Sequence, residues 1–219
     1  QAVARQVKND TRLVFVCNPN NPTGTFTSPL TVKAFCDDVS QKATVFSDEA
    51  YLEFLEPGLQ VSMVELVKQD KNIIVSRTFS KIHGLAGLRV GYLVAKPDLT
   101  KKITLCQNRL SNNQVAIAAA AASLGDEAFM DMTRKKNAEA RKILTDYLDA
   151  NKYAYGKSVT NFVMFDPKGD AAAILSKLAE RGIRIRTWDH QGRQWLRVSV
   201  GTSDEMNQFI NVYDEVVRT

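Results

Sequence analysis

Cysteine and histidine are scarce in this sequence of 219 residues. The three cysteines, Cys17, Cys36 and Cys106, are odd in number and far apart, which argues against a disulfide framework and for a reducing compartment, the cytoplasm. The two histidines, His83 and His190, form no Cys/His cluster with the spacing of a zinc site. The composition therefore predicts neither a disulfide-stabilised fold nor a metal centre.

Long hydrophobic runs and long runs of one charge are also missing. The most apolar stretch, residues 115–124, is alanine-rich and shorter than the roughly 20 residues that a membrane-spanning helix needs. The 29 lysines and arginines exceed the 24 acidic residues, but they are scattered and do not alternate with aromatic residues. We therefore expect no membrane span and no nucleic-acid partner. The chain starts at Gln1 and not at methionine, so a targeting segment is left open.

Short apolar segments alternate with helical patterns in the first half of the sequence. A helix is predicted from Pro29 to about Lys42, with Ser28 as its N-cap. Strands are predicted at residues 12–17, 43–47, 72–76 and 89–95. This alternation is typical of an α/β domain with a mostly parallel sheet.

The pattern changes after Asn113. An alanine-rich helix and a long amphipathic helix to about Asn151 come first. Further strands are predicted at residues 159–165, 182–187 and 195–200, and further helices at residues 171–181 and 204–217, the last with Ser203 as its N-cap. We therefore expect a partial large domain over residues 1–128 and a smaller C-terminal α/β domain over residues 129–219.

Polar side chains collect where the predicted strands of the first half end. They are Asn18, Asn20 and Asn21, then Asp48 and Tyr51, then Thr78, Ser80 and Lys81, with Arg89 beyond a glycine-containing loop. Ligands of open α/β sheets bind at the carboxyl ends of strands, so these groups are expected to form one site. The site would offer an amine, a carboxylate, a phenol, an amide, hydroxyls and a guanidinium. This set suits a cofactor that carries an aldehyde, a basic ring nitrogen, a phenolic oxygen and a phosphate.

Four motifs carry a resemblance to a known family. They read NPNNPTG (18–24), SDEAY (47–51), SRTFSKIHGLAGLRVGY (76–92) and WLRVSVGT (195–202). Together they resemble fold-type I aminotransferases, and among these the histidinol-phosphate aminotransferase group. The resemblance covers essentially the whole chain, as the C-terminal two-thirds of such a protein. It implies pyridoxal 5′-phosphate as cofactor and a homodimer with sites shared between subunits.

The resemblance also implies roles for the residues at the strand ends. Lys81 is implied to hold the cofactor aldehyde as a Schiff base and then to move the proton at the substrate Cα. Asp48 is implied to pair with the ring nitrogen, although Glu49 is a competing carboxylate. Tyr51 and Asn21 are implied to hydrogen-bond the phenolic oxygen, with Asn21 also beside the substrate and Asn21–Pro22 as a cis peptide.

The remaining implied roles concern anions. Thr78, Ser80 and Arg89 are implied to bind the cofactor phosphate. Arg197 is implied to bind the substrate carboxylate, and its alternation in the predicted strand places it on one face with Trp195 and Ser199. Arg186 is implied to contact a substrate phosphate, with Arg184 and Arg193 as nearby competitors.

The sequence departs from the histidinol-phosphate group at residues 107–114 and 187–195, which flank the substrate pocket in that group. The donor is therefore left open among histidinol phosphate, aromatic amino acids and other free amino acids. A decarboxylase of the phosphothreonine type, and a cofactor-binding regulatory module or inactive fragment, also remain open. The N-terminal motifs of the family are absent, so we expect the chain alone to bind cofactor weakly and to turn over slowly.

Overall fold

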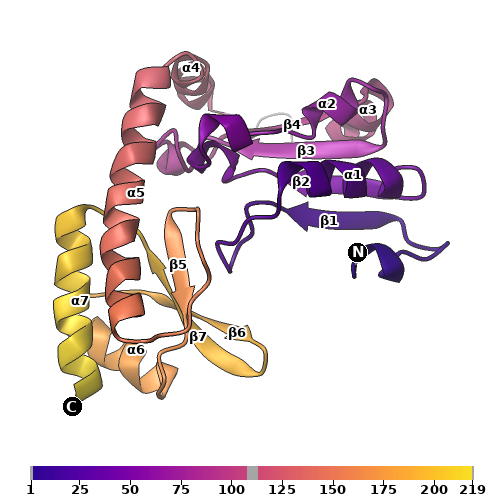
Figure 1. Cartoon of the computed structure of the whole chain (residues 1–219). Coiled ribbons are helices and arrows are strands. Elements are labelled where there is room, and N and C mark those ends of the chain that lie inside the picture. Colours follow the sequence, from indigo (N-terminus) through magenta and orange to yellow (C-terminus); the bar gives the residue numbers. More distant parts are fainter. Residues whose placement is uncertain (1, 108–112, 219) are drawn as a thin grey trace. The chain divides into compact units, whose positions relative to one another are not determined.

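The computed structural model describes residues 2–107 and 113–218 and divides the chain into two compact units (Figure 1). Unit 1 contains Gln1–Pro19 and Thr27–Met130, and unit 2 contains Asn20–Phe26 and Asp131–Thr219. A short loop near the start of the chain thus belongs to the second unit. None of the helices in the described ranges is both long and apolar enough to cross a membrane.

Unit 1 contains a four-stranded sheet. Its strands are β1 (Leu13–Cys17), β2 (Thr44–Asp48), β3 (Ile73–Thr78) and β4 (Gly91–Ala95), in the order β1-β2-β3-β4. The first three strands are parallel, and β4 runs antiparallel to β3. This sheet confirms the predicted α/β class with a mostly parallel sheet. The register places Cys17, Asp48 and Ser76 side by side near the carboxyl ends of the parallel strands.

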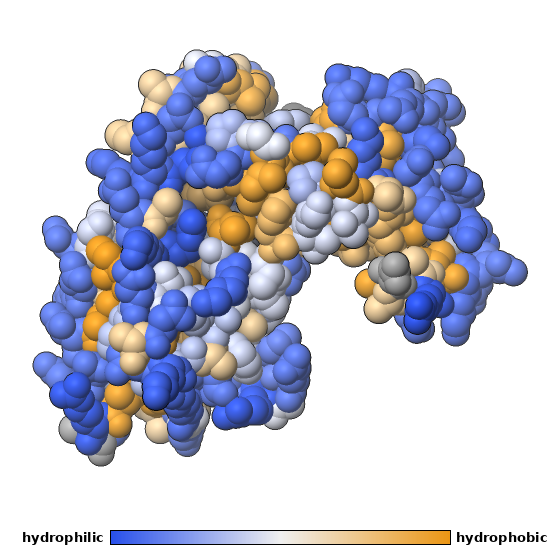
Figure 2. All heavy atoms as spheres, viewed as in Figure 1, coloured by the Kyte–Doolittle hydropathy of each residue, from blue (hydrophilic) through white to orange (hydrophobic). Residues whose placement is uncertain are grey.

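One face of this sheet forms the core of unit 1. The helices of the unit are α1 (Pro29–Val39), α2 (Val64–Val67), α3 (Pro97–Cys106) and α4 (Gln114–Ser123), with short 3-10 helices at Ala4–Gln6, Leu52–Phe54, Pro57–Leu59 and Ala86–Leu88. Val45 and Ile73 from the strands pack with Cys36 of α1 and Leu66 of α2. The side chains at alternate positions of β1 are not covered, since Phe15 is 64% exposed. Figure 2 shows that hydrophobic residues lie on the surface of the molecule.

Unit 2 contains a three-stranded antiparallel sheet packed on helices. Its strands are β5 (Phe162–Phe165), β6 (Arg186–His190) and β7 (Arg193–Ser199), in the order β5-β7-β6. The helices are α5 (Glu127–Ala150), which begins at the end of unit 1, α6 (Ala171–Glu180) and α7 (Ser203–Arg218). Leu148, Leu178 and Tyr213 from the three helices enclose Leu196 of β7 in one core.

The Asn20–Phe26 loop is bonded to the segment before β5. Val159 N donates to Gly24 O at 3.0 Å. Gly24 has a φ of +73°, and a Cβ there would lie 2.3 Å from Ser158 Oγ. Only glycine accepts this left-handed backbone together with so close a neighbour. The NPNNPTG motif therefore ends in a glycine that this packing requires.

Several element boundaries differ from the predictions. The helix after Ser28 ends at Val39 and not at about Lys42, and Ser28 makes no side-chain cap bond. The fourth strand begins at Gly91 and not at Arg89, because Arg89 has a φ of +54°. The strand predicted at residues 182–187 lies at Arg186–His190, because Gly182 adopts a φ of +79° and prolongs the turn after α6.

Two further differences come from hydroxyl side chains. The strand predicted from residue 159 starts at Phe162, since Ser158 and Thr160 hydroxyls both bond to Phe162 O. The cap of the last helix is Thr202 and not Ser203: Glu205 N donates to Thr202 Oγ1 at 3.2 Å, and Thr202 N donates to Glu205 Oε2 at 2.6 Å. This reciprocal pair is a capping box. Helices α2 and α3 were not predicted.

Candidate active site

Asp48 stands at the end of β2, between Cys17 and Ser76 on the neighbouring strands. Its Oδ1 accepts a hydrogen bond from Ala50 N at 3.1 Å and lies 3.4 Å from Ser76 Oγ. These donors fix the carboxylate in place while the residue keeps partial exposure. Asp48 is therefore a held anion that a ligand can reach at the carboxyl edge of the sheet.

Glu49, the adjacent acid, has a different environment. It is 3% exposed and accepts hydrogen bonds from Ser62 Oγ and Met63 N, both at 2.7 Å. Arg77 Nη2 lies 2.8 Å from Glu49 Oε2, and Arg77 also pairs with Glu53. Burial alone lowers the pKa of Arg77, but the Glu53 and Glu49 carboxylates outweigh it and the pKa is raised. Glu49 is thus committed to an internal ion network, which leaves Asp48 as the acid that faces a ligand.

Lys81 opens a tight turn that follows β3. Gly84 N donates to Lys81 O at 3.0 Å, and Gly84 has a φ of +70°. Ile82, the next residue, is fully buried and anchors the turn. The Lys81 Nζ lies 5.4 Å from the ring centroid of Tyr51, which is itself 4% exposed. The structure therefore presents an amine against the face of a buried phenol.

Thr78, Ser80 and Arg89 gather around the same turn. Thr78 Oγ1 accepts a hydrogen bond from Ser80 N at 3.1 Å, and Phe79 N donates to Val90 O at 3.2 Å. The second bond brings the Arg89 segment back beside the lysine turn. Arg89 is exposed and its Nη1 donates to Ala86 O at 2.8 Å. The three groups thus belong to one loop system, with donors available to an anion.

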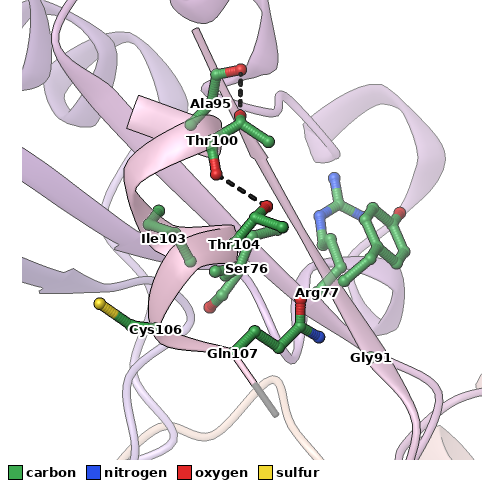
Figure 3. Close-up of a pocket in the computed structure, with 11 residues that line it drawn as sticks. Ser76, Arg77, Gly91, Ala95, Thr100, Ile103, Thr104, Cys106 and Gln107 are labelled. Carbon is green, nitrogen blue, oxygen red and sulfur yellow. Dashed lines mark hydrogen bonds between the residues drawn. The ribbon is translucent and has the colours of Figure 1, made fainter. Parts of the chain in front are cut away.

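A hollow of about 680 Å³ lies between α3 and the strands β3 and β4 (Figure 3). Ser76 and Gly91 line it from the strands, while Thr100 and Thr104 line it from the helix and Gln107 from the residue after the helix. Lys81 and Asp48 are not among its lining residues, so the hollow is distinct from the strand-end site. Ser76 links the two, because its hydroxyl lies 3.4 Å from Asp48 Oδ1. Arg77 also lines the hollow (Figure 3), and its guanidinium pairs with Glu49 and Glu53.

The other predicted site residues belong to unit 2. Arg186 and Arg197 are direct partners in the antiparallel pairing of β6 and β7. Arg197 Cζ lies 3.7 Å from the ring centroid of Phe162, and its strand neighbours Leu196 and Val198 are buried on the opposite face. Arg186 is exposed. This face of the small sheet therefore concentrates positive charge.

Asn21 lies exposed in the Asn20–Phe26 loop of unit 2. The Asn21–Pro22 peptide is cis, which confirms the prediction, and Asn18–Pro19 is cis as well. Residues 108–112 of the divergent segment 107–114 lie outside the described residues. The structure thus groups the predicted site residues in two sets. Asp48, Tyr51, Thr78, Ser80, Lys81 and Arg89 are in unit 1, and Asn21, Arg186 and Arg197 are in unit 2.

One buried polar contact beside Lys81 was missed by the sequence analysis. His83 Nδ1 and Ser123 Oγ are 2.6 Å apart, and they join the lysine turn to the end of α4. The position of His83 inside the lysine motif was the available signal. Its partner lies 40 residues away and has no pattern that reveals the pairing.

Comparisons with known proteins agree on one family. Residues 1–212 match the family described as aminotransferase class I and II. Histidinol-phosphate aminotransferase 1 of Cupriavidus pinatubonensis is 38% identical over 99% of this chain and 59% of its own length. Histidinol-phosphate aminotransferase 2 of Ralstonia nicotianae is 40% identical over 93% of this chain and 56% of its own length.

A solved structure gives the same result. The histidinol-phosphate aminotransferase of Sinorhizobium meliloti, in complex with pyridoxal-5′-phosphate, superposes with a TM-score of 0.87 at 31% identity, over 99% of this chain and 59% of that one. The chain thus spans less than two thirds of the length of the relatives that it matches.

Proposed function

Because the chain belongs to the aminotransferase class I and II family, we propose that it binds pyridoxal 5′-phosphate through Lys81 and transfers an amino group from an amino acid to a 2-oxo acid. The family predicted from the four sequence motifs is confirmed. The observation that carries the proposal is that unit 1 places an amine and a carboxylate at the ends of adjacent strands. Lys81 follows β3, and Asp48 is the last residue of β2.

The donor set fits the proposed cofactor. When bound, pyridoxal phosphate supplies an electrophilic aldehyde and an electron-withdrawing ring. The Lys81 amine would hold the aldehyde covalently, and as a free amine it would carry the proton to and from the substrate Cα. Asp48, held by Ala50 N, keeps a proton on the ring nitrogen, because a fixed carboxylate favours the charged partner. Tyr51 contributes its hydroxyl to the phenolic oxygen.

The phosphate is assigned to the loop that follows β3. Thr78 ends β3, and Ser80 and Arg89 lie on the segment between β3 and β4. Arg provides the charge-assisted hydrogen bonds that a phosphate accepts. Glu49 takes no part, since Arg77, Ser62 and Met63 already use its oxygens. Transfer of the amino group therefore needs only one acid from the SDEAY motif.

The arginine pair of unit 2 favours substrates with two anionic groups. Arg197 is assigned to the carboxylate, and Arg186, its cross-strand partner, to a second anion such as the phosphate of histidinol phosphate or the distal carboxylate of a 2-oxo diacid. Asn21 is assigned to the cofactor and substrate. Aromatic amino acids are the alternative donors. We also propose that the protein is cytoplasmic, in line with three free cysteines. A homodimer is proposed as well.

The test uses the protein at its natural length. Pyridoxal phosphate is added, the product is reduced with borohydride, and mass spectrometry locates the modified lysine. Histidinol phosphate and aromatic amino acids are then compared as donors to 2-oxoglutarate. Lys81→Ala is expected to abolish the long-wavelength absorbance of bound pyridoxal phosphate and the transfer of the amino group. Lys42→Ala, at an exposed lysine, is expected to leave both intact. A modified lysine other than Lys81, or an active Lys81→Ala variant, would refute the proposal.

A further inference from the structure

The turn that carries Lys81 is held at both ends by the sheet. Phe79 N donates to Val90 O at 3.2 Å and Leu85 N donates to Phe79 O at 2.9 Å. Between these bonds, Ile82 is fully buried and Phe79 is 4% exposed. The backbone near Lys81 is therefore fixed on the side of the strands. These bonds, and the one from Gly84 N to Lys81 O, all lie within the turn or between it and the residue before β4, so the opposite side of the turn needs its own contact.

His83 supplies the contact on that other side. Its ring is 7% exposed and packs on Phe79, with centroids 4.9 Å apart. Its Nδ1 lies 2.6 Å from the hydroxyl of Ser123, the last residue of α4. The bond is partly buried and the ring itself is buried, so the bond favours one ring orientation, in which the imidazole nitrogen keeps a partner. The lysine turn is thus bonded to the end of a helix 40 positions further along the chain.

The helix that holds Ser123 has few other anchors. Of the residues of α4, only Ala116 and Ala120 are buried, while Val115 and Ile117 are exposed. Small alanine side chains make few packing contacts, so they fix the position of a helix weakly. A directional hydrogen bond at the helix end therefore contributes strongly to its position. His83 and Ser123 therefore fix the turn and the helix end against each other.

We propose that His83, bonded to Ser123, is a positioning residue that holds the Lys81 amine against the ring of Tyr51 and so sets its reactivity. The inference rests on the proposed role of Lys81. His83 touches neither cofactor nor substrate in this scheme, and it acts through the turn that it shares with the lysine. Loss of the hydrogen bond would let the turn tilt and would change the 5.4 Å separation between Lys81 Nζ and Tyr51.

The test separates this bond from general packing by matched substitutions. The amide of asparagine reaches the position of imidazole Nδ1, whereas the amide of glutamine reaches that of Nε2. His83→Asn therefore keeps a partner for Ser123, and His83→Gln does not. In the same way, Ser123→Thr keeps the hydroxyl and Ser123→Ala removes it. Circular dichroism and thermal unfolding identify the variants that keep the fold.

Two measurements on the natural-length protein report on Lys81. Competitive labelling with acetic anhydride gives the rate of Lys81 acetylation without any cofactor, and pyridoxal phosphate with borohydride gives the rate of its covalent capture. We expect Ser123→Ala and His83→Gln to change both rates about fivefold, the factor that corresponds to one lost hydrogen bond, with Ser123→Thr and His83→Asn close to the native rates.

The outcomes are distinguishable. Unchanged Lys81 acetylation in a folded Ser123→Ala variant would overturn the positioning role, as would equal effects of His83→Asn and His83→Gln. If His83→Gln does not fold, the Ser123 pair decides. Capture of pyridoxal phosphate at a lysine other than Lys81 would refute the proposed function alone, because acetylation of Lys81 still reports on the position of its amine.

Discussion

Arg186 and Arg197 lie directly opposite each other on β6 and β7, so two guanidinium groups project from one face of the small sheet. Like charges in such a pair destabilise a sheet. An anion that binds both guanidinium groups would cancel this loss of stability. The pair therefore links the stability of unit 2 to its proposed substrate.

Arg186→Gln is expected to separate these two effects. The free energy of unfolding should stay unchanged or rise by up to about 0.5 kcal/mol, because a like-charge neighbour is removed. The KM for a donor with a phosphate should rise at least about tenfold, because a charged hydrogen bond is lost. Chemical unfolding and steady-state kinetics measure the two quantities. Arg184→Gln, at the exposed competitor, is the control, and an equal rise in its KM would contradict the assignment.

The environment of Glu49 is expected to matter for stability, and Asp48 is expected to matter for binding of pyridoxal phosphate. Arg77→Met leaves the buried Glu49 carboxylate without its cation and should lower the free energy of unfolding by about 3 kcal/mol. Asp48→Asn should cost less than about 1 kcal/mol and should instead weaken binding of pyridoxal phosphate. Urea unfolding and cofactor titration test both. Strong cofactor binding by Asp48→Asn, with weak binding by Glu49→Gln, would reverse the roles.

The three cysteines should react with a thiol reagent at very different rates. Cys106 is exposed, Cys17 is half-buried and Cys36 is fully buried. Burial, reinforced by the Glu49 carboxylate, raises the pKa of the Cys36 thiol to about 12, so almost no thiolate forms at pH 8. We expect one fast phase, which Cys106→Ser removes, and labelling of Cys36 only after unfolding. Fast labelling of Cys36 in the native protein would contradict the observed core.

Acidification should destabilise unit 1 through His83. Burial lowers the pKa of His83 below its usual value of 6.5, and the Glu53 and Arg77 charges act in opposite directions on it. The unfolded chain therefore binds a proton more readily than the native one, and stability present above pH 6.5 is lost as the pH falls through the lower folded pKa. His83→Asn, which cannot titrate, should show a shallower loss between about pH 7 and pH 5. Parallel curves for the two proteins would exclude this contribution.

The sequence predicted the three parallel strands of unit 1 well because each is a short run with β-branched residues and leads into a polar motif. It also placed Lys81, Asp48 and Tyr51 after strands of one sheet. Helix α3 was missed, and none of its residues is buried. The Thr202–Glu205 capping box was present in the sequence, but Ser203 competed for the same role.

Long-range polar pairings could not be predicted at all. Glu49 with Arg77 is separated by 28 residues, and His83 with Ser123 by 40. Such contacts depend on which elements pack together, and single residues carry no pattern for that. The cross-strand partnership of Arg186 and Arg197 was missed for a related reason, because register is fixed by the turn between the strands.

The Asn20–Phe26 loop has a consequence for how this protein can be divided. The chain passes from unit 1 to unit 2 after Pro19, returns after Phe26 and leaves again after Met130. No single cut yields both units intact, because cleavage after Met130 strips the second unit of the segment whose Gly24 carbonyl bonds Val159. Recombination between relatives at that junction would join a loop from one parent to a sheet from the other. Such a chimaera would take Gly24 and Ser158, which pack closely together, from different parents.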